Sequence, residues 1–121
     1  MKNAIPFNLF GEDQEICLTI PKLCQLERAT GKQIQEILSP GVVGVDICLS
    51  ALPVCLGKSD GGTYEEKLEK CLENGANIND IANRIVHAIL ATNILGKDLG
   101  DEVMELYYPT LKEEKKERKN E

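Results

Sequence analysis

The fold is decided by residues 11–38, which read GEDQEICLTIPKLCQLERATGKQIQEIL. In the first half, apolar side chains recur at every second position, a period typical of a half-buried β-strand; they are Ile16, Leu18 and Ile20. Pro21 then begins a helix, because the first helical turn does not need the backbone N–H that proline lacks. Gly31 ends this helix, since glycine adopts the left-handed conformation of a C-cap at little cost.

The flanking sequence predicts a hairpin and further helices. A first strand over residues 7–10 is expected to pair with a second strand over residues 15–20 across a turn at Gly11. Helices are predicted over residues 21–30, 32–38, 43–56, 63–73, 79–95 and 98–108. Pro53 predicts a kink or an early end of its helix near Leu52. The fold class is therefore α+β and mostly helical, with an N-terminal β-hairpin followed by four to six helices.

The length of 121 residues fits one domain with a modest core. We expect residues 1–109 to form this domain. Residues 110–121 mix both charges without apolar anchors, so we expect a disordered C-terminal tail there. No apolar segment typical of a signal peptide follows Met1, which favours a cytoplasmic protein.

The net charge of −6 disfavours two classes of partner. A nucleic-acid backbone and an anionic membrane surface both select basic proteins. The most apolar segment, residues 42–56, is shorter than the ~20 residues that cross a membrane, and it contains Asp46 and Pro53. We therefore expect neither nucleic acid nor a membrane as a partner.

Five cysteines are present, an odd number without close pairs. Cys17 and Cys24 are seven residues apart, as are Cys48 and Cys55, whereas structural zinc sites favour closer spacings. Without a signal peptide, the cysteines are expected to be free thiols that pack as small apolar side chains. We expect no metal.

Motifs for catalysis are missing from the sequence. Gly57-Lys58-Ser59 lacks the earlier glycine of a phosphate-binding loop, because Leu52 occupies that position. His87, the single histidine, lies on the least apolar sector of its helix, which predicts a solvated or capping side chain. We expect no catalytic residue, no cofactor and no enzyme, although a Cys/His hydrolase stays open because such residues meet in space.

The helix predicted over residues 79–95 is apolar on two sides. The side predicted to face the core holds Ile81, Ile85 and Ala88. The opposite side, predicted to bind a partner, holds Val86, Leu90 and Ile94. Either the helix over residues 43–56 covers this second side, or a partner or second copy does. We expect partial cover and self-association into a homo-oligomer.

A short hairpin, a helix ending in Glu-x-x-x-Gly-Lys from Glu27 to Lys32, and a second short amphipathic helix follow one another. This order resembles the small tail assembly chaperones of long-tailed bacteriophages and phage-like gene transfer agents, and the resemblance extends to about Gly96. It implies a protein of the bacterial host cytoplasm that keeps the phage tape-measure protein soluble during tail assembly. The alternative is a helical adaptor or regulatory module without catalytic activity.

Overall fold

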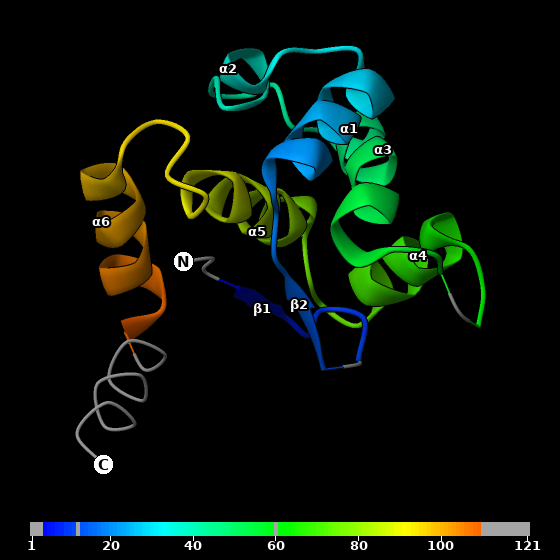
Figure 1. Cartoon of the computed structure of the whole chain (residues 1–121). Helices are drawn as coiled ribbons and strands as arrows, with labels where there is room; N and C mark the ends of the chain where they lie inside the picture. Colours follow the sequence, from blue (N-terminus) through cyan, green and yellow to red (C-terminus); the bar gives the residue numbers. More distant parts are fainter. Residues whose placement is uncertain (1–3, 12, 60, 110–121) are drawn as a thin grey trace.

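The computed structural model describes residues 4–11, 13–59 and 61–109. Over these residues a two-stranded antiparallel sheet precedes six helices (Figure 1). The elements are β1 (Ile5–Phe7), β2 (Gln14–Ile16), α1 (Ile20–Thr30), α2 (Ile34–Ile37), α3 (Val45–Leu56), α4 (Tyr64–Glu73), α5 (Ile78–Leu90) and α6 (Lys97–Tyr107). The predicted α+β class with an N-terminal hairpin is confirmed. The predicted tail, residues 110–121, lies outside the described residues.

The hairpin lies earlier in the chain than its predicted position. Ile5 pairs with Ile16 and Phe7 with Gln14, so the first strand is β1 and not residues 7–10. The alternation decides this register, because Ile5, Phe7 and Ile16 are all fully buried. A turn follows β1, closed by a 3.1 Å hydrogen bond from the Gly11 N–H to the Asn8 carbonyl oxygen. The second strand also ends early, at Ile16.

The predicted limits of α1 are close to the observed ones. Thr19 accepts a hydrogen bond of 3.4 Å from the backbone N–H of Lys22, so α1 begins at Ile20. Gly31 ends the helix with φ of 71°, the left-handed conformation that was predicted. The Glu27 carboxylate then accepts a 2.9 Å hydrogen bond from the Ile34 N–H. This bond explains why the glutamate of the Glu-x-x-x-Gly-Lys segment matters: it fixes the start of α2.

Pro53 predicted a kink or an early end of α3 near Leu52, and the helix does not end there. It continues through Pro53 to Leu56, and the Gly57 N–H donates to the Pro53 carbonyl oxygen at 3.0 Å. Leu52 is fully buried and Cys55 is nearly so. Packing of this helix on its neighbours therefore outweighs the loss of one backbone hydrogen bond at proline.

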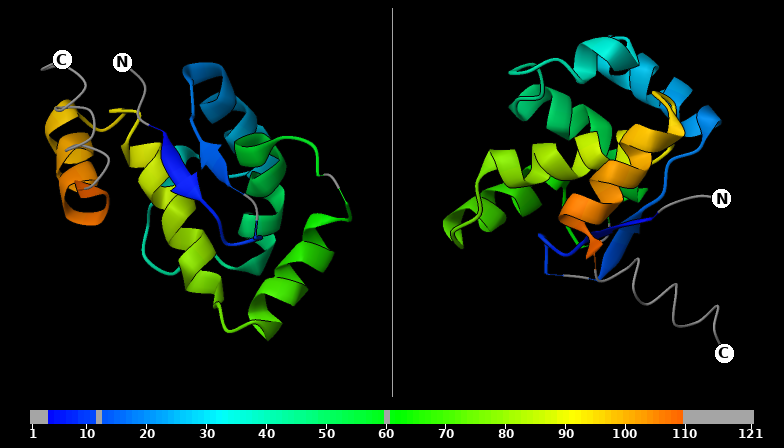
Figure 2. Two further views of the ribbon diagram at one scale, coloured as in Figure 1. Left: turned by 90° about the horizontal axis from the view of Figure 1, so that it is seen from below. Right: turned by 90° about the vertical axis from the view of Figure 1, so that its left-hand side faces the viewer.

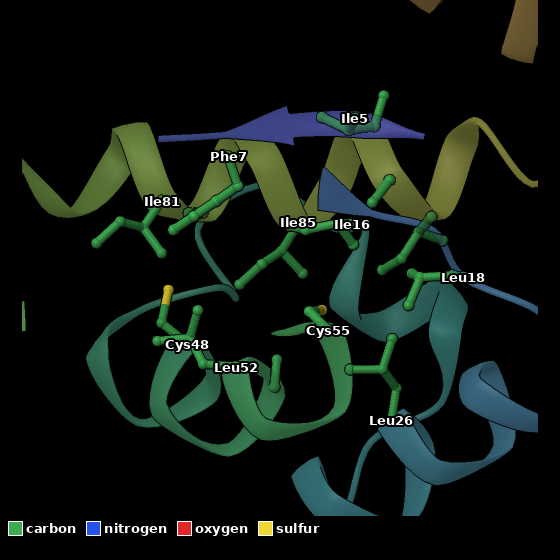
Figure 3. Packing of buried hydrophobic residues seen from close by; sticks show 14 of the residues in the cluster. Ile5, Phe7, Ile16, Leu18, Leu26, Cys48, Leu52, Cys55, Ile81 and Ile85 are labelled. Atoms are coloured by element: carbon green, nitrogen blue, oxygen red, sulfur yellow. The ribbon is translucent and has the colours of Figure 1, made fainter. Parts of the chain in front are cut away.

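The core lies between α3 and the layer formed by the hairpin and α5. Figure 3 shows Phe7, Ile16 and Ile85 on one side, facing Cys48 and Leu52 of α3 on the other. Helix α3 also contacts α1 and α4, which places it at the centre of the fold. Helix α6 packs against α5 and lies at the end of the molecule (Figure 2).

Helix α5 is shorter than predicted, ending at Leu90 and not at residue 95. Asn93 takes a left-handed conformation with φ of 67°, which a helix cannot continue through. The Thr92 hydroxyl donates to the Ile89 carbonyl oxygen at 2.6 Å and accepts from the Ile94 N–H at 3.2 Å, closing the turn. Gly96 directly precedes α6 as its N-cap residue.

Candidate functional site

The three residues predicted to bind a partner do not share one exposed helix face. Val86 and Leu90 lie on α5 and are half-buried, whereas Ile94 lies beyond the end of α5 with 43% of its surface exposed. Helix α6 approaches α5 closely here: a Cβ added to Gly100 would lie 3.0 Å from the Leu90 carbonyl oxygen. Helix α6 therefore approaches the C-terminal end of α5 at Leu90, and Ile94 is the exposed member of the set.

Four exposed apolar residues lie on α6 or directly before it in the chain, and we call them together the α6 apolar surface. It consists of Ile94, Leu95, Leu99 and Leu106, with 43%, 44%, 37% and 66% of their surfaces exposed. Leu99 and Leu106 are two helical turns apart and share one side of α6. Val103 lies between them along the chain, about 40° around the axis from Leu99 on the side away from Leu106, and is buried. The apolar side of α6 is therefore wider than the part that the fold covers.

Acidic residues border this surface. Glu102 is exposed and lies on α6 beside Leu106, about 40° away around the helix axis. Asp98, also exposed, precedes Glu102 by four residues and lies on the same side. Lys97 makes a 2.9 Å ion pair with Asp101, on the side of α6 away from Leu106. The polar edge next to the exposed leucines is thus negatively charged.

A cluster of polar and aromatic side chains holds α6 in place. His87 Nδ1 and the Tyr108 hydroxyl oxygen are 2.8 Å apart and share a hydrogen bond. The Arg84 guanidinium lies 5.3 Å from the centre of the Tyr108 ring and donates to the Pro6 carbonyl oxygen at 2.9 Å. The Tyr107 ring stacks on the His87 ring with 4.2 Å between centroids. The cluster joins β1, α5 and the end of α6.

His87 is therefore half-buried and bonded to another side chain, whereas the helix pattern predicted a solvated or capping side chain. Burial lowers the pKa of His87 from its ordinary value, and the nearby Arg84 charge lowers it further. Burial also raises the pKa of Tyr108, an effect that Arg84 opposes. Both groups are thus held neutral near pH 7, which suits a structural contact between two helices.

Other parts of the fold are weaker candidates for a functional site. A hollow of about 710 Å³ lies between the hairpin turn and α4, but its lining mixes Glu66 with Lys67 and Lys70, so no single charge selects a ligand. Among the described residues, no three His, Cys, Asp or Glu side chains gather as a metal site. None of the helices formed by the described residues is long and apolar enough to cross a membrane.

All five cysteines are free, as predicted. Cys48, Cys55 and Cys71 are buried, Cys17 is half-buried and Cys24 is exposed. Burial raises the pKa of Cys48 to about 11 and that of Cys55 to about 12. A thiol with so high a pKa carries almost no thiolate at neutral pH and is a poor nucleophile.

Comparison with known proteins identified no relative of this chain. The chain matches no family model, no curated protein and no solved structure.

Leu99 and Leu106 were not identified from the sequence as candidate binding residues. Their seven-residue spacing was a usable signal, because it places two leucines on one side of a helix next to the buried Val103.

Proposed function

We propose that the protein binds another protein through the α6 apolar surface and acts as a tail assembly chaperone for a phage tape-measure protein. The observation that carries the proposal is the exposure of four apolar side chains on α6 or directly before it in the chain. Grouped apolar exposure is typical of protein-binding sites, whereas single exposed residues such as Ile20 are ordinary. The resemblance of residues 11–38 to tail assembly chaperones supplies the kind of partner.

The proposed role involves binding without catalysis. A tape-measure protein has long apolar helical stretches, which aggregate when they are left uncovered. A chaperone for it requires apolar binding surfaces together with an exterior that keeps the complex soluble, and the net charge of −6 favours solubility. The proposal places this activity in the cytoplasm of a bacterial host, without nucleic acid, membrane, metal or cofactor, and includes self-association of the chaperone.

Co-expression with a phage tape-measure protein tests the proposal. We expect the wild-type protein to move the tape-measure protein into the soluble fraction, and Leu106→Ser to lose most of this effect. Leu72→Ser is the matched control, since Leu72 is an exposed leucine that lies on α4 and is not part of the α6 apolar surface. A tape-measure protein that is equally insoluble with and without the chain contradicts the chaperone role and favours the helical adaptor instead.

Light scattering on the purified protein tests self-association separately. We expect a mass above that of the monomer at micromolar concentration. A monomer under these conditions contradicts self-association but leaves the proposed binding of a partner intact.

A further inference from the structure

The α6 apolar surface has a shape that restricts its occupant. Leu99 and Leu106 lie about 10 Å apart along the helix axis, and the exposed Ile94 and Leu95 directly precede α6 in the chain. The surface is the outside of a helix, where backbone groups are already bonded within the helix. An added β-strand needs free backbone groups at a sheet edge, whereas a helix packs side chains between side chains. The shape therefore favours a helix as the occupant.

The charge beside this surface restricts the occupant further. Glu102 and Asp98 are both exposed on the edge next to the leucines. The one lysine of α6, Lys97, is paired with Asp101 on the other side. A helix that covered Leu99 and Leu106 would bring its own flanking residues close to Glu102. Basic flanking residues gain from this approach, and acidic ones are repelled.

A second copy of the chain fits this surface poorly. In a two-fold symmetric dimer the same patch meets itself, so the acidic edges of both copies enter one interface. Like charges at such an interface oppose association. The occupant that fits both the leucines and the acids is a different segment.

We infer that the α6 apolar surface binds an amphipathic helix that carries Lys or Arg beside its apolar stripe. The inference rests on the proposed function and specifies which segment of the partner is recognised. Leu99 and Leu106 provide the apolar contact, and Glu102 with Asp98 selects the charge of the flanking residues. Basic amphipathic stretches of the partner are bound in preference to acidic ones.

Two synthetic helical peptides test the inference, both with the same leucine stripe but one flanked by lysines and the other by glutamates. Fluorescence anisotropy at low salt is expected to show about tenfold tighter binding of the lysine peptide, weakening as salt screens the charges. Glu102→Lys is expected to weaken binding of this peptide severalfold and to strengthen binding of the glutamate peptide. Lysine is tolerated at this position because it pairs with Asp98 four residues away.

Glu69→Lys is the matched control, since it makes the same charge change on an exposed residue of α4. If it has the same effect as Glu102→Lys, net charge and not the α6 edge governs binding, and the inference is overturned. Equal affinity of the wild-type protein for both peptides, or binding of neither, also overturns it. The proposed function is judged apart from these results, by whether Leu106→Ser loses the solubilising effect in co-expression.

Discussion

His87 and Tyr108 join the third turn of α5 to the end of α6 through a hydrogen bond of 2.8 Å between Nδ1 and the hydroxyl oxygen. Tyr108 is 8% exposed, so water cannot readily replace its hydroxyl group. Tyr108→Phe is expected to lower the free energy of unfolding by about 1 kcal/mol, because His87 loses its partner in a partly buried site. Urea denaturation measures the change. Tyr107→Phe, at the exposed neighbouring position, is the control and should leave stability nearly unchanged.

The lowered pKa of His87 predicts that the stability of the protein depends on pH. The pKa of this histidine in the folded protein lies below the ordinary value of 6.5, mainly through burial and also through Arg84. When pH falls below 6.5, the unfolded state binds a proton that the folded state does not, so unfolding is favoured. The contribution of His87 is complete above 6.5 and is lost as pH falls through the range down to the folded pKa.

Denaturation of the wild type and His87→Gln on both sides of pH 6.5 tests this dependence. The wild type should lose more stability on acidification than the variant, whose glutamine does not titrate. Parallel losses would show that carboxyl groups elsewhere, and not His87, cause the pH dependence.

Ile85 is fully buried in the layer of α5 that faces α3 (Figure 3). Ile85→Ala is expected to cost about 2–5 kcal/mol of unfolding free energy, because it removes apolar contacts and leaves a cavity. Ile20→Ala is the control, since Ile20 is 60% exposed and its truncation should cost less than about 0.5 kcal/mol. Similar costs at the two positions would contradict the assignment of Ile85 to the core.

Local sequence rules located the ends of several helices well. Pro21, Gly31 and Thr63 act within one turn of the chain, and the structure shows the expected left-handed cap at Gly31. Thr63, where the helix over residues 63–73 was predicted to begin, accepts a 3.2 Å hydrogen bond from the Glu66 N–H at the start of α4. Such signals depend on a few neighbouring residues, so the sequence alone carries them.

Features set by distant contacts were not predictable in this way. The sequence predicted a helix to residue 56 but also a kink or an early end at Pro53, and the continuation of α3 through Pro53 depends on packing against other helices. For the side of α5 that holds Val86 and Leu90, the sequence left open cover by the helix over residues 43–56, by a partner or by a second copy. A helical pattern does not show that α6 packs against the end of α5. The wider apolar side of α6 was visible in the spacing of Leu99 and Leu106, but which part of it the fold covers required the structure.

Gly100 permits the close approach of α6 to the end of α5. A Cβ at this position would lie 2.0 Å from the Asn93 side-chain oxygen and 3.0 Å from the Leu90 carbonyl oxygen. Gly100→Ala is therefore expected to cost about 1–2 kcal/mol, although alanine is the better helix former. In an Asn93→Gly background the cost should shrink, because the nearer clash is gone and glycine suits the left-handed φ at position 93.

Gly44→Ala is the control for this substitution. Gly44 lies before α3 with negative φ, and nothing lies within 4 Å of its added Cβ. A destabilisation as large as that of Gly100→Ala would show that loss of glycine itself, and not the contact with α5, is responsible.

The cysteines are predicted to react in two groups. Burial raises the pKa of Cys48 to about 11 and of Cys55 to about 12, and it also raises the pKa of Cys71. A thiol reagent at neutral pH should therefore modify Cys24 quickly in the folded protein, Cys17 more slowly, and the three buried thiols only after unfolding. The absorbance of the chromophore that the reagent releases, measured with and without denaturant, gives the number of cysteine thiols that have reacted. Cys24→Ser should remove the fast phase, and a fast phase that survives this substitution would mean that a buried cysteine is accessible in the folded protein.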